Sequence, residues 1–424
     1  MTRIAQLATG SSPVEFEGAM EHLAAELRRL DLLIARRIHV FRCSINEIEA
    51  RAPSAPTYIS DQEVDWLLQR PHDYTVRDDT VELLDAEISA QEELIAHGTL
   101  AGEENGVAFP LLRLAQLFDL SWLEYQIVLL CLAPELRRKY DRIYAYLQDD
   151  ITRKRPSLDL ALDLFIDTEQ ERWQARTQLA GHNHLFMHKL VHQTDDVHSP
   201  SGSSGLSSLL KLDQHILQYI LGDNRHDEQL QPYMQVVSAT ENSADVDAVQ
   251  VDNLYSMALN AENPGKGLLF HLHGAGVDVR RNLVIAVVQR LDCDLILVDG
   301  RTVAASSAAD DQLLNRIARE SVLQGIPLIL ERVDEWLHGD AVSQYRLSQL
   351  TAALNRYCPL AFSSSGNPWP VASNDALTVI NVPVSLPGSA QYAKLWQRAL
   401  VDLRFTAADT EVEQLTGRLP QTMR

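Results

Sequence analysis

The sequence predicts a multi-domain α/β protein, in which a helical N-terminal half precedes a parallel sheet flanked by helices. Two patterns support this class. In the first half, apolar residues recur at three- and four-residue steps, which is typical of amphipathic helices. After residue 266, short apolar runs alternate with helical segments, which is typical of a parallel sheet. A Ser/Gly-rich stretch at 198–208 separates the two patterns and indicates a flexible linker.

Composition narrows the class of protein. The chain has 424 residues, of which 46% are hydrophobic and 22% charged, and it is long enough for several domains with their own cores. The formal net charge of −21 argues against broad binding to nucleic-acid backbones. The four cysteines are widely spaced, which indicates free thiols. With no recognisable signal peptide or membrane-spanning run, we expect a cytoplasmic protein with no membrane partner.

The first long helix is expected within residues 15–50. Its apolar stripe comprises Met20, Leu23, Leu27, Leu30, Ile34, Ile38, Phe41, Ile45 and Ile48. The opposite face carries Glu26, Arg28, Arg29, Asp31, Arg36 and Arg37. Such a stripe can pack within its own domain or against another subunit, and both interpretations stay open. A second amphipathic helix is expected at 80–97, followed by a Gly/Glu-rich boundary at 98–106.

Several short helices are expected between residues 108 and 166. Ser121 to Glu124 form a capping box before an apolar run, and Pro134 should end that helix. Ser157 should cap a helix at 158–165. This arrangement fits a winged-helix domain. The best candidate for a wing strand is 185–191, and 209–221 is expected to be a short helix.

A mixed-charge segment is the best nucleic-acid candidate. Its basic residues are Arg137, Arg138, Lys139, Arg142, Arg153, Lys154 and Arg155. Its acidic residues are Glu135, Asp141, Asp149, Asp150, Asp159 and Asp163. Because carboxylates repel phosphates, this composition favours a protein-binding face over a nucleic-acid interface.

The second half alternates strands and helices. Strands are expected at 268–272, 294–298, 327–330, 359–363 and 378–384. Helices are expected at 280–291, 311–323, 343–357 and 389–403. Residues 267–281 place a glycine-containing turn between the first strand and helix, as a P-loop does.

The P-loop-like turn has lost the residues that act on nucleotides. An ungapped match from Gly274 puts Val279 at the second glycine, Arg280 at the lysine and Arg281 at the Mg²⁺-binding hydroxyl. Arg280 could still meet a phosphate, but Arg281 cannot hold a metal. We therefore expect ATP to bind weakly or not at all, and Mg²⁺ not to bind.

The later strands show the same loss. Glu331 stands where the third strand should carry a metal-binding aspartate, and Arg332 replaces the catalytic glutamate. An arginine cannot act as a base at neutral pH. Ser365 falls near the position of a sensor asparagine, although a surface turn is the preferred interpretation. The candidate nucleotide-binding residues are Gly274, Gly276, Arg280, Arg281, Glu331 and Ser365, with no catalytic residue and no metal ligand.

Several stretches resemble a known family. Leu117–Leu136, Tyr144–Asp150 and Arg155–Pro156 resemble the winged-helix segment of a bacterial AAA-type ATPase family, often found with extracellular contractile injection systems, which are phage-tail-like particles. Glu26–Leu33 and Tyr58–Asp61 are similar to its N-terminal region. The resemblance implies a helical region, a winged helix, a degenerate first AAA cassette and a complete second one.

This sequence departs from that pattern. It ends near 415–418, where the first lid would begin, and no Gly-x-Gly-Lys-Thr occurs in it. The family's ATPase activity therefore does not carry over. The domains expected are a helical region at 1–105, a winged-helix-like domain at 106–198, a linker and connecting helix at 199–235, and a degenerate AAA-like P-loop domain at 236–424.

The resemblance suggests a function. It implies a catalytically impaired pseudo-ATPase, or regulatory module, that acts in assembly or cargo loading of a phage-tail-like particle. Its partners would be a sibling AAA ATPase, particle subunits or a second copy of the chain. One alternative is an ATP-binding AAA protein with residual or partner-dependent hydrolysis. The other is a winged-helix nucleic-acid binder.

Overall fold

The computed structural model describes residues 16–51, 64, 68, 78–180, 183–194, 208–223, 225–239, 246–259, 267–306, 311–337, 340–370 and 377–385. The chain divides into two compact units, residues 1–225 and 226–424. Each unit has its own set of buried apolar side chains. Residues 198–207 of the predicted linker, the predicted helix at 389–403 and the segment 415–418 lie outside the described residues.

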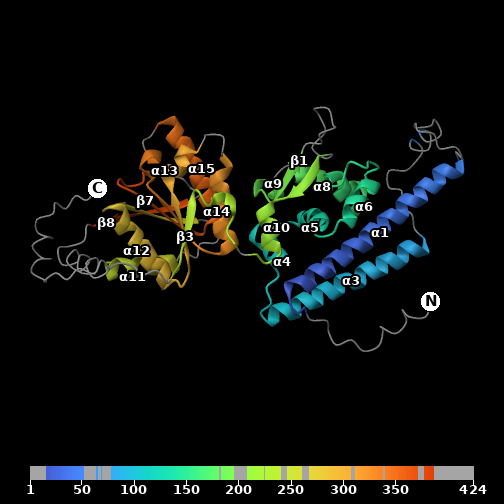
Figure 1. The fold of residues 1–424 in the computed structure, drawn as a ribbon, viewed down its shortest axis with the longest axis horizontal. Helices are drawn as coiled ribbons and strands as arrows, with labels where there is room; N and C mark the ends of the chain where they lie inside the picture. Colours follow the sequence, from blue (N-terminus) through green and yellow to red (C-terminus); the bar gives the residue numbers. More distant parts are fainter. Residues whose placement is uncertain are drawn as a thin grey trace, which may run out of the picture. The chain divides into compact units, whose positions relative to one another are not determined.

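Unit 1 is mainly helical (Figure 1). Its described helices are α1 (Ala19–Arg51), α3 (Asp79–Glu104), α4 (Pro110–Leu117), α5 (Trp122–Leu136), α6 (Lys139–Leu147), α7 (Leu158–Phe165), α8 (Glu169–Ala180), α9 (His184–Met187) and α10 (Gln214–Ile220). The apolar stripe of α1 is buried at Leu23, Leu27, Leu30 and Ile34, although Met20 is exposed. Because α1 packs on α3, α5 and α7, the stripe serves its own unit.

The charged face of α1 corrects an expectation from the sequence. Glu26 and Arg29, expected on the solvent face, are each only 4% exposed. The reason is that α1 has neighbours on more than one side, so part of its polar face is covered by α5. Other members of that face form ion pairs across the unit, such as Arg36 with Asp167.

The caps of α5 and α7 follow the sequence pattern, but the end of α5 does not. Ser121 and Glu124 form the expected capping box, and the Ser157 hydroxyl accepts a hydrogen bond from the backbone N–H of Leu160. Pro134 does not end α5, which continues to Leu136. Proline deprives the carbonyl four residues earlier of its helical donor. That carbonyl, of Leu130, accepts instead from the Tyr144 hydroxyl at 2.9 Å.

A two-stranded wing completes unit 1. Strand β1 (Val191–Thr194) pairs antiparallel with β2 (Leu209–Leu212). The predicted strand at 185–191 is wrong, because the Asn183 side chain accepts from the Leu185 N–H and starts α9. The predicted helix at 209–221 is wrong in its first part. Leu210 and Leu212 are buried while Lys211 is exposed, which is the two-residue period of a strand, and α10 begins only after its cap, Asp213.

Unit 2 is built on a six-stranded sheet (Figure 1). Its strands are β3 (Met234–Val237), β4 (Gly267–Gly274), β5 (Leu295–Asp299), β6 (Leu328–Glu331), β7 (Leu360–Ser365) and β8 (Leu377–Val384). They lie in the order β3-β5-β6-β7-β4-β8. All five strands expected from the sequence form parallel pairs. The expectation of an all-parallel sheet is corrected at one edge, where the unpredicted β3 runs antiparallel to β5.

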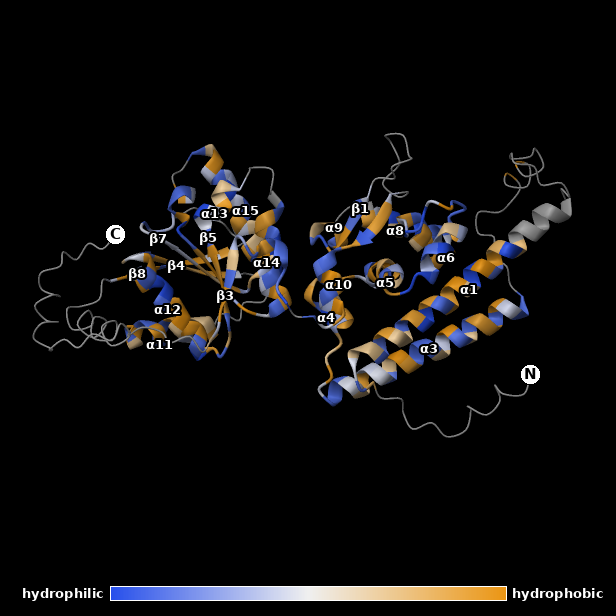
Figure 2. Cartoon of the chain, in the orientation of Figure 1, coloured by the Kyte–Doolittle hydropathy of each residue, from blue (hydrophilic) through white to orange (hydrophobic). Residues whose placement is uncertain are grey.

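Helices cover both faces of this sheet. They are α11 (Ala248–Leu259), α12 (Val277–Arg290), α13 (Gly300–Ala305), α14 (Asp311–Gln324) and α15 (Ala341–Tyr357). Helices α11 and α12 lie on one face and α13 to α15 on the other (Figure 1). The central strands are mostly hydrophobic (Figure 2), as expected for a sheet buried on both sides. In the described parts of the chain, no helix has the length and apolar character required to cross a membrane.

Candidate nucleotide site

The predicted site residues lie around the carboxyl ends of β4, β6 and β7. Ligands of open α/β sheets bind outside this edge, where the loops that follow the strands meet. Gly274 ends β4, Glu331 ends β6 and Ser365 ends β7. Arg280 and Arg281 lie in the first half of α12, which follows β4.

The turn between β4 and α12 is too short for a phosphate cradle. Only Ala275 and Gly276 separate the strand from the helix, so Val279 is already helical. Gly274 has a φ of +103°, and a Cβ there would lie 2.7 Å from the Val384 carbonyl oxygen, so glycine is required. Gly276 has an ordinary φ of −56° and precedes the helix. A P-loop needs four residues between its glycines to surround phosphates.

Arg280 faces its own turn. Its side chain is buried, and Nη1 donates to the carbonyl oxygens of Gly274 and Ala275. Desolvation lowers the pKa of this guanidinium. Arg280 is therefore held by backbone carbonyls, where the lysine of a P-loop would point to a phosphate.

Arg281 and Glu331 form a bidentate ion pair. Arg281 Nε lies 2.8 Å from Glu331 Oε1, and its Nη2 donates to Oε2. Glu331 is 1% exposed, and its hydrogen bond raises the pKa of Arg281. Such two-pronged pairs are strong and geometrically specific. Because both carboxylate oxygens accept from Arg281, a protein cation lies where the metal would bind in a P-loop enzyme.

Arg332 does not reach toward the turn. It has a φ of +56°, and its Nη1 lies 2.7 Å from Oδ2 of Asp299 at the end of β5. The neighbouring acidic residue Asp334 also has a partner within the protein. Asp334, within the short helix η2 (Val333–Leu337), accepts from the Gly366 N–H at 2.6 Å.

Ser365 corrects another expectation from the sequence. It is fully buried and does not lie in a surface turn. Its hydroxyl donates to the Asn367 carbonyl and lies 3.0 Å from Nε2 of His271, a buried residue of β4. His271 Nδ1 lies 2.8 Å from the Ser363 hydroxyl, and burial lowers the pKa of the ring to about 4. Ser365 thus belongs to a neutral polar cluster around His271.

Strand alternation separates Ser365 from the ion pair and reveals a residue that the sequence analysis missed. Ser364 pairs with Glu331 across β6 and β7, so the two side chains share one face of the sheet, and Ser365 points to the other. The Ser364 hydroxyl is buried, with no hydrogen-bond partner among the described residues. The two-residue period of the strand predicted at 359–363 could have identified Ser364 if that strand had been extended by one residue.

The structure brings together four of the six predicted residues, in two linked pairs. Arg281 and Glu331 are in contact, and Gly274 and Arg280 are linked through the turn. Ser365 lies apart from the ion pair. What the arrangement can do chemically is to hold the ends of β4, β6 and α12 together without a metal.

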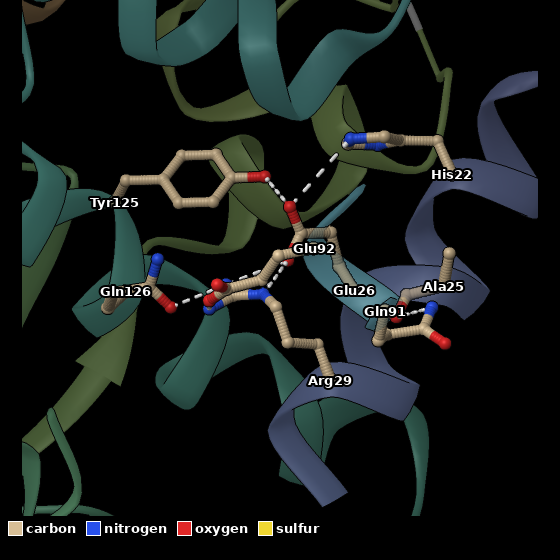
Figure 3. A network of polar contacts seen from close by, with 8 residues as sticks. All are labelled: His22, Ala25, Glu26, Arg29, Gln91, Glu92, Tyr125 and Gln126. Carbon is tan, nitrogen blue, oxygen red and sulfur yellow. Dashed lines mark hydrogen bonds and ion pairs between the residues drawn. The ribbon is translucent and has the colours of Figure 1, made fainter. Parts of the chain in front are cut away.

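Unit 1 has a buried polar network of its own (Figure 3). Glu26 accepts from Arg29 at 2.8 Å and from the Tyr125 hydroxyl at 2.8 Å, and Arg29 donates to Gln126 at 2.7 Å. His22 lies 3.9 Å from Glu26, and burial lowers the pKa of its ring. These contacts join α1 to α5. A buried network whose members pair with one another fixes the packing of helices.

The mixed-charge segment is partly neutralised. Lys139 lies 2.6 Å from Asp31 of α1, Arg155 lies 2.8 Å from Glu135, and Arg153 lies 3.6 Å from Asp150. Cations that face carboxylates attract phosphates weakly. These ion pairs reduce the positive charge that the segment presents, and the preference for protein contacts over nucleic acid stays a prediction.

Comparison with known proteins identifies the first half of the chain. A family model described as "Winged helix domain, variant" matches residues 10–234. The chain belongs to this winged-helix family. A search of curated proteins found no match.

Parts of some solved structures are similar to this chain. One from work titled "Structural Basis for Katanin Self-Assembly" is 12% identical with a TM-score of 0.32, and the match covers 42% of this chain and 66% of that one. The FIGL-1 AAA domain is 12% identical with a TM-score of 0.35, covering 46% and 72%. A chain of the E. coli MS115-1 HORMA:CdnC:Trip13 complex is 15% identical with a TM-score of 0.29, covering 41% and 74%.

Proposed function

We propose that this winged-helix protein carries an AAA-like unit that has lost nucleotide turnover and acts as a protein-binding module. The observation that carries the proposal is the Arg281–Glu331 ion pair, in which Glu331 stands where the family pattern has a metal-binding aspartate. Its partners would be a sibling AAA ATPase or subunits of a phage-tail-like injection particle, in whose assembly or cargo loading it would act. This finer role rests on the sequence resemblance.

Three features oppose ATP hydrolysis. A Mg²⁺ ion needs carboxylate oxygens and substrate phosphates as ligands, and Glu331 already pairs with Arg281. Phosphate binding needs a cradle of backbone N–H groups, and only Ala275 and Gly276 lie between β4 and α12. Activation of water needs a base, and the position of the catalytic glutamate holds Arg332.

Binding of a fluorescent ATP analogue, with and without Mg²⁺, tests the proposal. We expect no saturable binding up to millimolar analogue, and no change on adding Mg²⁺. An Arg301→Ala chain, altered at an exposed arginine of α13, is the matched control for loss of one positive charge. Saturable, Mg²⁺-dependent binding that weakens in Arg280→Ala and not in Arg301→Ala would refute the loss of the site.

Direct titration against purified candidate partners tests the protein-binding half of the proposal. We expect the chain to bind an AAA ATPase or an injection-particle subunit in the absence of nucleotide. Binding that requires ATP would contradict a module that works without it.

A further inference from the structure

His39, Cys43 and Asp78 bring three metal-ligating groups together in unit 1. His39 and Cys43 lie one turn apart on the same face of α1, and Asp78 is the residue before α3. One ligand atom from each residue lies within 4.8 Å of the others. Side chains that are distant in sequence thus converge on one point between two helices.

The spacing suits a tetrahedral ion. Cys43 Sγ lies 3.6 Å from His39 Nε2, and that nitrogen lies 2.7 Å from Asp78 Oδ2. Zinc bonds of about 2.0 Å to nitrogen and 2.3 Å to sulfur would separate those two ligand atoms by roughly 3.5 Å. The sulfur and nitrogen already have this separation. The nitrogen and the carboxylate oxygen need to part by less than about 1 Å.

Asp78 is oriented for this contact. Its Oδ1 accepts from the backbone N–H groups of Thr80 at 3.1 Å and Val81 at 2.9 Å, which directs Oδ2 to His39. The His39 and Asp78 side chains are 27% and 40% exposed, so an ion can reach them.

We propose that His39, Cys43 and Asp78 form a Zn²⁺-binding site, with water in the fourth position. A thiolate, an imidazole and a carboxylate are the ligand types that zinc uses, and hard cations such as Mg²⁺ do not favour sulfur. Binding would release the thiol proton of Cys43. The ion would link α1 to the start of α3. The zinc site is independent of the proposed function, which rests on unit 2.

Zinc titration of the full, untagged chain tests the site. The protein is first treated with a chelator and dialysed. Zn²⁺ is then added in the presence of a chromophoric chelator that competes for it. We expect one tightly bound equivalent. Cys43→Ser and His39→Asn should each weaken binding by at least about ten-fold, since even supporting residues of metal sites contribute that much. Cys293→Ser, which alters the other half-buried cysteine, is the matched control and should bind as the wild type does.

Cobalt binding gives a second readout, and its main part uses only the wild-type chain. The wild-type chain with Co²⁺ should show a thiolate-to-metal absorption band and the strong visible bands of a tetrahedral ion, and Cys43→Ser should lack the thiolate band. The proposal is overturned if wild-type chain does not compete for Zn²⁺, if Cys43→Ser binds as tightly as wild type, or if Cys293→Ser weakens binding equally.

Discussion

The guanidinium of Arg281 takes the place of a metal ion in unit 2, because it provides the positive charge that pairs with Glu331. Glu331 is buried and depends on this partner. Glu331 comes fifty residues after Arg281 in the sequence. The sequence could show that the ordinary ligands are missing. It could not show that two substituted residues pair with each other, because that contact depends on the sheet order.

Removing one member of this pair should cost stability. Arg281→Met leaves a buried carboxylate without its partner, and we expect a loss of about 3 kcal/mol, the low end for a broken buried pair because Arg281 is partly exposed. Urea unfolding of wild type and variant gives the difference. The double variant Arg281→Met/Glu331→Leu should recover most of it, since an apolar pair of similar size replaces the charges. A single variant as stable as wild type would contradict this account.

His271 should make the stability of unit 2 depend on pH. Its pKa falls from 6.5 to about 4 on burial, so the unfolded chain binds the proton more readily. The stabilising contribution is complete above pH 6.5 and decreases as the pH falls toward 4. Between pH 7 and 4.5 we expect about 2 to 3 kcal/mol to be lost through this residue. Denaturant unfolding across that range should show a weaker pH dependence in His271→Gln, and parallel curves would disprove the assignment.

At the scale of elements, the sequence predicted the strands that contain a strong apolar run. It did not predict short interrupted strands or features that depend on contacts between segments far apart in the sequence. The strands β4 to β8 were expected because each contains a run of apolar residues. The four-residue strand β3 was missed because Gln235 interrupts its apolar run and four residues are too few to show a period. The prediction of a strand at 185–191 was wrong because Asn183 caps a short helix, α9, at the start of this apolar run. Burial of Glu26 and Arg29 depends on Tyr125 and Gln126, which come from a distant helix.

In helix α5, the Tyr144 hydroxyl replaces the backbone hydrogen bond that Pro134 removes, and this replacement can be tested. Tyr144→Phe removes the donor to the Leu130 carbonyl that Pro134 leaves without its helical partner. A buried, unpaired carbonyl costs about 1 to 3 kcal/mol, and we expect a loss in that range. Tyr146→Phe, at an exposed tyrosine of the same helix α6, is the control and should change stability little. Equal thermal midpoints for the two variants would contradict the role of Tyr144.

At the scale of the whole molecule, the family match covers most of unit 1 and reaches β3 in unit 2. The predicted linker lies between β1 and β2, which pair with each other, and the division between units falls after Arg225. The domain limits expected from the sequence stay a prediction. The composition of the sequence located the Ser/Gly-rich stretch. Only the pairing of β1 with β2 shows that this stretch connects two strands of one hairpin.

Limited proteolysis should reflect this pairing. Residues 199–205 are rich in Ser and Gly, so we expect the first cut there. The two pieces should separate on a denaturing gel and elute together in gel filtration, because β2 pairs with β1 and contacts α5. A chain whose pieces separate under native conditions, or a first cut within 268–330, would be incompatible with the fold described.

Steady-state phosphate release with Mg²⁺ and ATP tests the central claim most directly. We expect the purified chain and its Glu331→Gln variant to release phosphate at the same background rate as a protein-free blank. The physical reason is that Glu331 pairs with Arg281 and that Arg332 replaces the base. Phosphate release above the blank in the wild-type chain that disappears in Glu331→Gln would show a working hydrolytic centre and contradict the account.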